Sequence, residues 1–144
     1  LVGSEMCIRD RSSSISRGDV GLHALKLKGS DIIIGVIGIR KATMDNQEIY
    51  EALAYLDPKY WHSKYAKEAL FALMQDAFDH GITDIHAFIN MENYNMQFLL
   101  ESLGYIKIGD QTINLNYNIV TRAHYIAHPS ENKKTADDLF FVNF

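Results

Sequence analysis

Apolar residues alternate or cluster in the first third of the chain and recur at helical spacing in the middle. The β-branched run over residues 32–39 predicts a central strand, and alternation over 22–27 and 48–56 predicts a strand on each side of it in the sequence. Gly35, inside the central run, indicates a bulge or a close backbone neighbour. The polar segment 41–47 predicts a turn, so we expect an antiparallel meander.

A helical pattern follows this meander. Apolar residues recur every three or four positions over 63–80, which predicts a long amphipathic helix. A strand is predicted over 84–89 and a second helix over 94–103, with Asn93 as its N-cap. The polar residues of the first helix that we expect to face water are Lys67, Glu68, Gln75, Asp76 and Asp79.

Two more strands are predicted near the end of this pattern, over 105–108 and within 120–127. Between them, the Asn-rich segment 112–118 predicts a loop or a strand edge. A meander followed by a strand–helix–strand unit combines antiparallel with parallel pairing. The predicted fold class is α/β (α+β): a mixed, twisted sheet with helices packed on it and segment 32–39 at its centre.

The two ends of the chain do not continue this pattern. Residues 1–12 have no apolar period and resemble translated adaptor sequence, so we expect a non-native leader that lies outside the fold. Residues 13–128 are expected to form one partial domain. The remaining tail, residues 129–144, has no predicted structure.

Composition narrows the classes of function. A net charge of −4 over 144 residues argues against a broadly basic surface that binds nucleic acid. The longest apolar run, 32–39, is too short to cross a bilayer as a helix. Cys7 is the single cysteine, so no internal disulfide can form and a cytoplasmic location is expected. His124 and His128 would lie about 13 Å apart on a strand, and no cysteine or carboxylate cluster accompanies them, so no metal site is predicted.

The segment between the third strand and the long helix carries the clearest ligand signal. It turns at Asp57-Pro58 and then enters the helix. The first N–H groups of a helix have no internal acceptor, and the helix dipole favours negative charge there. Phosphates of a ligand would therefore lie between Trp61 and Lys67.

Three blocks of residues carry a family resemblance. Residues 51–61 read Glu-Ala-Leu-Ala-Tyr-Leu-Asp-Pro-Lys-Tyr-Trp, and 65–69 read Tyr-Ala-Lys-Glu-Ala. Residues 92–93, Glu-Asn, are followed at 100–105 by Leu-Glu-Ser-Leu-Gly-Tyr. In this order they resemble E-x-x-x-x-L-x-P-x-Y-W, Y-A-T-E-A, and E-N-x-x-S with L-E-K-L-G-F of the GNAT family of N-acetyltransferases. The resemblance is to the branch that includes ribosomal-protein N-terminal acetyltransferases, and it extends over residues 22–127.

The resemblance implies an acetyl-CoA-dependent enzyme that transfers an acetyl group to an amine by direct attack. The amine would belong to a protein N-terminus or a small molecule, and the residues do not distinguish these acceptors or indicate an oligomeric state. In the family, the loop before the long helix cradles the pyrophosphate of the cofactor. The cofactor-binding residues that this implies are Trp61, His62, Ser63, Lys64, Tyr65, Ala66 and Lys67. Asn93 would contact the pantetheine arm, and Glu51 is the candidate catalytic base, with a solvated or ion-paired strand carboxylate as its alternative role.

Two positions depart from the family pattern. The family has Gly-x-Gly where this chain has His62-Ser63-Lys64, although glycine allows a close backbone approach. Met96 stands where the branch often has Ser. The alternative function is therefore a non-catalytic relative that binds CoA or another protein. Family members also begin with a strand and one or two helices, for which the residues before 22 are too few, so we expect a truncated reading frame.

Overall fold

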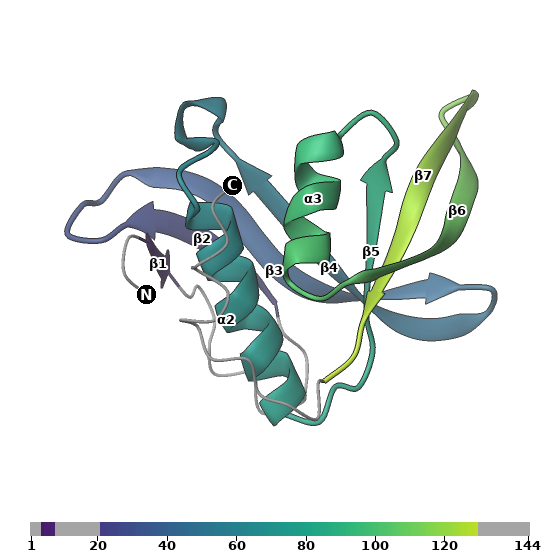
Figure 1. The fold of residues 1–144 in the computed structure, drawn as a ribbon, viewed down its shortest axis with the longest axis horizontal. Helices are drawn as coiled ribbons and strands as arrows, with labels where there is room; N and C mark the ends of the chain where they lie inside the picture. Colours follow the sequence, from purple (N-terminus) through teal and green to yellow (C-terminus); the bar gives the residue numbers. More distant parts are fainter. Residues whose placement is uncertain (1–3, 8–20, 130–144) are drawn as a thin grey trace. The chain divides into compact units, whose positions relative to one another are not determined.

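The computed structural model describes residues 4–7 and 21–129. The chain divides into two compact units, unit 1 ending at Ile85 and unit 2 beginning at His86 (Figure 1). Most of the predicted leader and nearly all of the predicted tail lie outside the described residues. None of the helices in the described ranges is long and apolar enough to cross a membrane.

The described part of unit 1 is a meander of antiparallel strands followed by a long helix. Its elements are β1 (Ser4–Cys7), β2 (Leu22–Leu27), β3 (Ile33–Met44), β4 (Gln47–Leu56), the 3-10 turn η2 (Pro58–Tyr60) and α2 (Tyr65–Asp79). The strands lie in the order β1-β2-β3-β4, and each pairs antiparallel with the next. The meander and the position of β3 between two other strands are therefore confirmed.

The prediction for the first residues of the chain is wrong. Residues 4–7, which we expected to lie outside the fold, form β1 and pair with β2 from Ser4↔Leu27 to Cys7↔Ala24. The turn expected within 41–47 is confirmed and is only two residues long, Asp45–Asn46, because β3 and β4 extend to Met44 and Gln47. The φ angles of these two residues are 50° and 62°, and Asp and Asn adopt this left-handed conformation more readily than other residues with a β-carbon.

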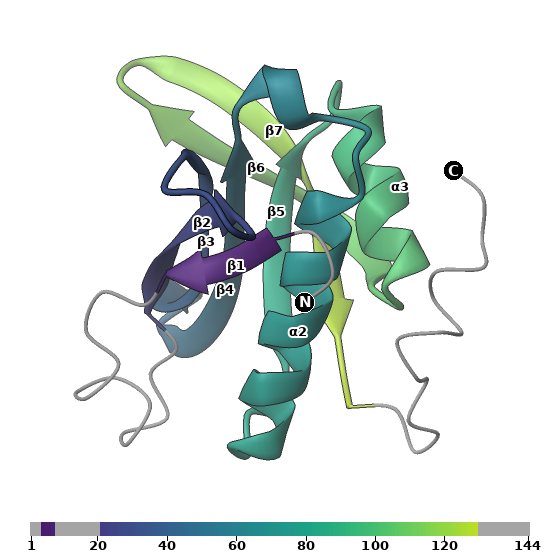
Figure 2. The ribbon, with the colours of Figure 1, turned by 90° about the vertical axis from the view of Figure 1, so that its left-hand side faces the viewer.

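The core of unit 1 lies between α2 and one face of the meander, as Figure 2 shows. Ile37 and Ile39 of β3 and Leu70 and Leu73 of α2 are at most 2% exposed. Gly35 is required where β3 passes β4, because a β-carbon there would overlap the carbonyl oxygen of Tyr55. The predicted close backbone neighbour is thus confirmed.

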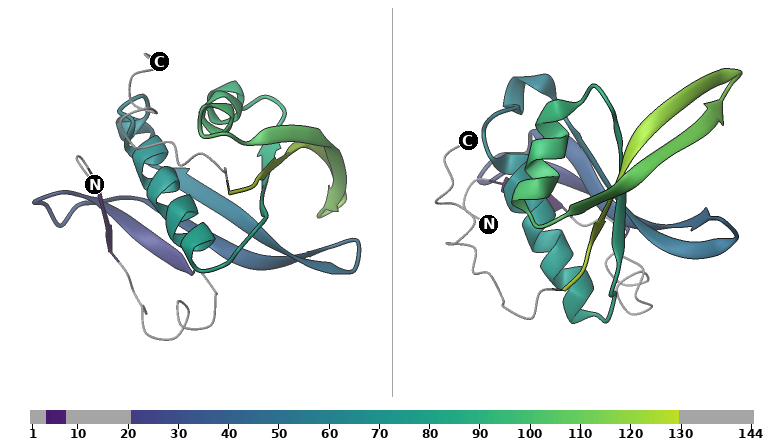
Figure 3. Two further views of the ribbon diagram at one scale, coloured as in Figure 1. Left: turned by 60° about the horizontal axis from the view of Figure 1, so that its bottom comes forward. Right: turned by 45° about the vertical axis from the view of Figure 1, so that its right-hand side comes forward.

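Unit 2 contains a helix and three strands. Its elements are β5 (Ile85–Asn90), α3 (Tyr94–Ser102), β6 (Ile106–Leu115) and β7 (Asn118–Ala127). The strands lie in the order β5-β7-β6, so β7 is flanked on both sides. The loop or strand edge predicted over 112–118 is confirmed, because this segment contains the end of the edge strand β6 and a two-residue turn at Asn116–Tyr117 that closes a long hairpin (Figure 3). The predicted α/β class, with antiparallel strands at the start and two helices in these places, is confirmed.

Candidate functional site

The start of α2 leaves backbone donors without helical acceptors. The first hydrogen bond of the helix runs from the Glu68 N–H to the Lys64 carbonyl oxygen, with an N···O distance of 3.0 Å. The N–H groups of Tyr65 and Ala66 precede it, where helix geometry supplies no internal acceptor. Lys64 is the N-cap residue and makes no side-chain hydrogen bond to this turn. The donors therefore point out of the positive end of the helix dipole, an arrangement suited to anions.

The loop before α2 contains two left-handed residues that are not glycine. The φ angles of His62 and Lys64 are 61° and 65°. A left-handed conformation costs about 1–2 kcal/mol for a residue with a β-carbon, and glycine adopts it freely. These are the two positions at which the family resemblance expects glycine. The loop therefore has glycine-like backbone angles at both positions although the glycines are absent.

Local hydrogen bonds hold this loop against the end of β4. The Trp61 indole Nε1–H donates to the Leu56 carbonyl oxygen at 2.9 Å, and the Ser63 hydroxyl donates to the Tyr60 carbonyl. The Asp57 N–H donates to the Ile34 carbonyl of β3 at 2.8 Å. The loop is thus tied both to itself and to the sheet, which fixes the direction in which α2 leaves β4.

Positive side chains lie next to the helix donors. Burial lowers the pKa of Lys67, and the neighbouring Lys64 cation lowers it further. Lys67 and Glu68 are 7% and 8% exposed, so the prediction that both face water is wrong. Neighbouring atoms can cover the stems of long charged side chains while the charged ends reach polar groups. A helix dipole disfavours cations at this end, and a bound anion would offset that cost.

Glu51, the candidate base, lies on β4 directly opposite Arg40 of β3. Its Oε2 accepts hydrogen bonds from Arg40 Nε at 3.0 Å and from Nη2 at 2.8 Å. The Glu51 side chain is 6% exposed, whereas that of Arg40 is 56% exposed. Glu51 is thus an ion-paired strand carboxylate, the alternative role expected for it, and it lies on β4 outside the loop.

Asn93 lies in unit 2 and caps α3. Its Oδ1 accepts a hydrogen bond from the Met96 N–H at 3.2 Å, which confirms the predicted N-cap. The Asn93 N–H itself donates to the Asn90 carbonyl at 2.9 Å. The side-chain oxygen therefore has a structural task in unit 2, and its contact with pantetheine stays a prediction.

A buried histidine pair in unit 2 was not predicted. His86 Nδ1 and His124 Nε2 are 2.8 Å apart, and the residues are 8% and 9% exposed. The His124 ring also stacks on Phe88, with centroids 4.4 Å apart. Burial lowers the pKa of His124, and His86 lowers it further. No group of three or more metal-ligating side chains occurs within residues 4–7 and 21–129.

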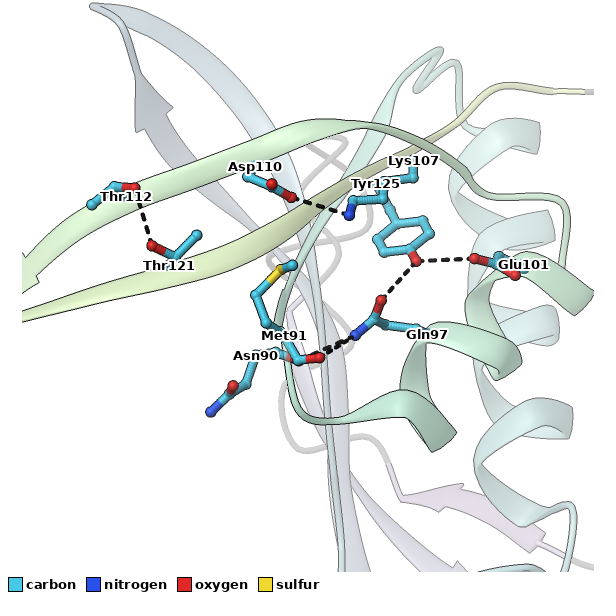
Figure 4. Close-up of polar contacts among 9 residues, drawn as sticks. All are labelled: Asn90, Met91, Gln97, Glu101, Lys107, Asp110, Thr112, Thr121 and Tyr125. Atoms are coloured by element: carbon cyan, nitrogen blue, oxygen red, sulfur yellow. Dashed lines mark hydrogen bonds and ion pairs between the residues drawn. The ribbon is translucent and has the colours of Figure 1, made fainter.

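The contacts of Tyr125 were also not predicted from the sequence, because its partners lie far away along the chain. Its hydroxyl donates to Glu101 Oε1 at 3.0 Å and approaches Gln97 Oε1 at 3.2 Å, so it ties β7 to α3 (Figure 4). Burial and the Glu101 carboxylate raise the pKa of Tyr125 to about 12. Tyr105 is 3% exposed, and burial raises its pKa. Neither phenol is suited to ionise near neutral pH.

Comparisons with known proteins address the family directly. The model of the acetyltransferase (GNAT) domain matches residues 5–106. A search of functionally curated proteins gives no match. Among similar solved structures, the GNAT-family acetyltransferase from Bacillus anthracis is 24% identical, with a TM-score of 0.66 over 74% of this chain and 65% of that one.

Two further structures extend this likeness. The yncA protein from Salmonella typhimurium, solved with its cofactor acetyl-CoA, is 14% identical, with a TM-score of 0.66 over 83% of this chain and 70% of that one. The ribosomal-protein-S5-alanine acetyltransferase from Vibrio fischeri is 17% identical, with a TM-score of 0.68 over 80% of this chain and 64% of that one. This chain thus spans about two thirds of the length of these proteins, and at such identities the likeness concerns the fold.

Proposed function

Because the family model matches residues 5–106, this chain belongs to the GNAT acetyltransferase family, and we propose that it transfers an acetyl group from acetyl-CoA to an amine. The start of α2 supports this proposal most strongly. It combines open N–H groups at Tyr65 and Ala66 with the positive charge of Lys64 in one turn. That arrangement suits the pyrophosphate of the co-substrate, which the yncA structure contains as acetyl-CoA. We also propose that the chain acts in the cytoplasm.

The loop contributes by holding the co-substrate in one position. The hydrogen bonds of Trp61 and Asp57 fix the loop before any ligand arrives, so little freedom is lost on binding. Lys67 would add a second positive charge at the start of α2, because binding of an anion would favour its protonated form.

The chemical step is direct transfer. The amine nitrogen attacks the thioester carbonyl carbon, a C–N bond forms, the C–S bond breaks, and CoA leaves as a thiolate. The attacking amine must lose one proton, either to a side chain or to water. The protein's share is to align the two reactants and to polarise the carbonyl with backbone N–H groups. We propose a protein N-terminus or a small primary amine as the acceptor.

Glu51 is our candidate for the group that takes the proton. It is the buried carboxylate of β4, the strand that leads into the loop. The Arg40 guanidinium occupies its Oε2 with two hydrogen bonds, so this oxygen is not open to a substrate while the ion pair is formed. In the proposed reaction Glu51 would act through a bound water or would exchange Arg40 for the ammonium group of the acceptor.

A pair of variants separates the catalytic role of Glu51 from a structural one. Glu51→Gln and Arg40→Met both remove the ion pair and should lower the free energy of unfolding by about 1–3 kcal/mol. If Glu51 is the base, Glu51→Gln lowers kcat by at least about 100-fold, whereas Arg40→Met retains turnover. Equal kcat values for both variants at equal CoA affinity would contradict the assignment of Glu51 as the base.

The second candidate function is a relative that binds CoA without catalysis. The left-handed His62 and Lys64 favour it, since a β-carbon at either position restricts the approach of phosphates. Titration calorimetry with CoA, followed by a thiol-release assay with acetyl-CoA and a panel of amines, distinguishes the two functions. Binding with turnover supports the enzyme, and binding without turnover on any amine supports the relative. No binding heat would contradict both.

A further inference from the structure

The β6–β7 hairpin of unit 2 has a well-supported base and an open tip. At the base, Tyr125 is bonded to α3, and Ala123 and Ala127 of β7 are at most 1% exposed. Toward the tip, Thr112 and Thr121 face each other at 3.2 Å, and β6 is exposed along its length except at Gln111 and Ile113, which are half-buried. Figure 4 shows this pair far along the hairpin from Tyr125. The tip is a two-stranded ribbon, which has little stability alone.

The outer edge of β6 is protected only near the base. In the described order of unit 2, β6 is the end strand, so one side of its backbone faces no neighbouring strand of this unit. Its register shifts between Lys107 and Gly109, and Lys107 forms an ion pair with Asp110 at 3.1 Å. A bulge and charged side chains are the usual means by which proteins prevent edge strands from pairing with other chains.

The distal part of the same edge has no such protection. From Gln111 to Leu115 the strand carries no charge, no proline and no register shift. Arg122, the nearest cation on β7, is bonded through Nη2 to the Gln111 side chain at 2.7 Å and lies over the Phe88 ring. This five-residue segment is therefore an uncharged, regular strand whose outer edge pairs with no other strand of the described residues.

Large apolar side chains surround this open segment. Leu115 and Tyr117 are 52% and 101% exposed. An uncharged edge strand flanked by exposed apolar residues is the feature that natural sheets generally avoid unless the edge is paired.

We propose that this edge, Gln111–Leu115 of β6, pairs antiparallel with the same segment of a second copy of the chain. A two-fold axis at Ile113 would place Ile113 opposite its own copy, Gln111 opposite Leu115, and Thr112 opposite Asn114. No charged residues oppose each other in this register. The Thr112 hydroxyl and the Asn114 amide each donate and accept hydrogen bonds, so the pair is self-complementary.

The same register adds apolar contact outside the five paired residues. Tyr117 at the tip of one copy would lie beside Gly109 of the other, next to Ile108, which is 53% exposed. An extended acceptor peptide could also add to this edge. The second copy is the better fit, because the segment offers no charged group that would recognise the ammonium group of a peptide. This inference does not depend on the proposed acetyl transfer.

Sedimentation equilibrium of the full chain tests the proposal. The wild type should form dimers in a concentration-dependent manner. Ile113→Lys and Ile113→Glu should each weaken the dimer by at least about tenfold, because like charges would meet at the axis. Mixing these two variants should restore the dimer, since lysine then faces glutamate. Ile119→Lys, on the inner strand β7, is the matched control and should dimerise like the wild type.

Three results would overturn the proposal. They are a wild type that stays monomeric, a dimer that Ile113→Lys leaves intact, and a mixture of the two Ile113 variants that fails to associate although each is folded by circular dichroism. A monomeric wild type whose binding of an acceptor peptide is lost in Ile113→Lys would assign the edge to the peptide instead.

Discussion

Helices α2 and α3 begin in opposite ways. At the start of α3, the Asn93 side chain accepts the Met96 N–H at 3.2 Å, so the helix supplies its own cap. At the start of α2, Lys64 has a left-handed backbone and makes no side-chain hydrogen bond to the first turn. The first turn of α3 therefore receives a hydrogen bond from a side chain of the protein. The first turn of α2 receives none from its N-cap residue, and it also has positive charge and a strained backbone next to it.

The difference separates a structural helix end from a ligand-binding one. A polar cap stabilises a helix by about 1 kcal/mol, so a chain that forgoes it at α2 loses stability there. Left-handed residues without glycine add to that loss, and such strain often occurs where a site must be preformed. A ligand phosphate would therefore bind with a larger gain in free energy at the start of α2 than at the start of α3.

The largest effect is expected from displacing the strand that leads to α2. Gly35→Ala would place a β-carbon against the Tyr55 carbonyl oxygen. It should lower the free energy of unfolding by about 1–3 kcal/mol and weaken CoA binding, while amide protection in α3 is retained. Urea denaturation and hydrogen exchange provide the measurements. Val36→Ala, at an exposed neighbouring position, is the control, and equal losses in both variants would contradict the assigned role of Gly35.

The strain at the start of α2 can be relieved directly. His62→Gly and Lys64→Gly should each raise the free energy of unfolding by about 1 kcal/mol without ligand, because glycine adopts the left-handed conformation freely. Ser63→Gly is the matched control and should give no gain, since it removes the hydroxyl that is bonded to Tyr60. Denaturation curves of the single and double variants measure this. Stability unchanged by both substitutions would show that the loop is not strained.

Removing the cap of α3 tests the other side of the comparison. Asn93→Ala should lower the free energy of unfolding by about 1 kcal/mol, whereas Lys64→Ala should not, because Lys64 provides no side-chain cap. Asn95→Ala, within α3, controls for the loss of an exposed amide. The idea that the two helix starts differ would fail if Lys64→Ala cost as much stability as Asn93→Ala.

Acid should affect unit 2 through its histidine pair. The pKa of His124 is lowered from its ordinary value of 6.5, so the unfolded chain binds the proton more readily than the folded one. Stability is therefore complete above that value and is lost as the pH falls from about 6.5 toward the folded pKa. Protection of the β7 amides against hydrogen exchange should be modestly lower at pH 5.5 than at pH 7.5. His124→Phe should remove this dependence of stability on pH. If the variant lost as much protection at pH 5.5 as the wild type, His124 would not be the cause.

The features that the sequence predicted are local in the chain. The Asn93 cap joins residues three positions apart, and the strand and helix periods are read within single segments. The turn was predicted only as lying within 41–47, although the dipeptide Asp45–Asn46 is a signal for a two-residue hairpin turn at that position. A two-residue turn at this place sets the strand register, so the sequence alone is enough to place Arg40 opposite Glu51 once the turn is recognised.

Other features depend on contacts that the sequence does not encode locally. His86 and His124 are 38 residues apart, and they meet only because β5 and β7 are neighbours in the sheet. Periodicity placed Lys67 on the polar face of α2, but packing around the first turn covers it. For the candidate site, the family resemblance located the loop, whereas its left-handed angles at residues other than glycine follow no local sequence signal.

The most direct test of the account is the dissociation constant of CoA for the wild type and for Lys64→Gly, measured by calorimetry at two salt concentrations. If the start of α2 binds the pyrophosphate, the wild type binds and Lys64→Gly binds more tightly at both concentrations. Relief of about 1–2 kcal/mol of strain should then exceed the loss of one partly exposed ion pair. No binding by either protein would contradict the site. Weaker binding by Lys64→Gly with a shallower salt dependence would show that the lysine side chain is itself a phosphate ligand and that the strain argument is wrong.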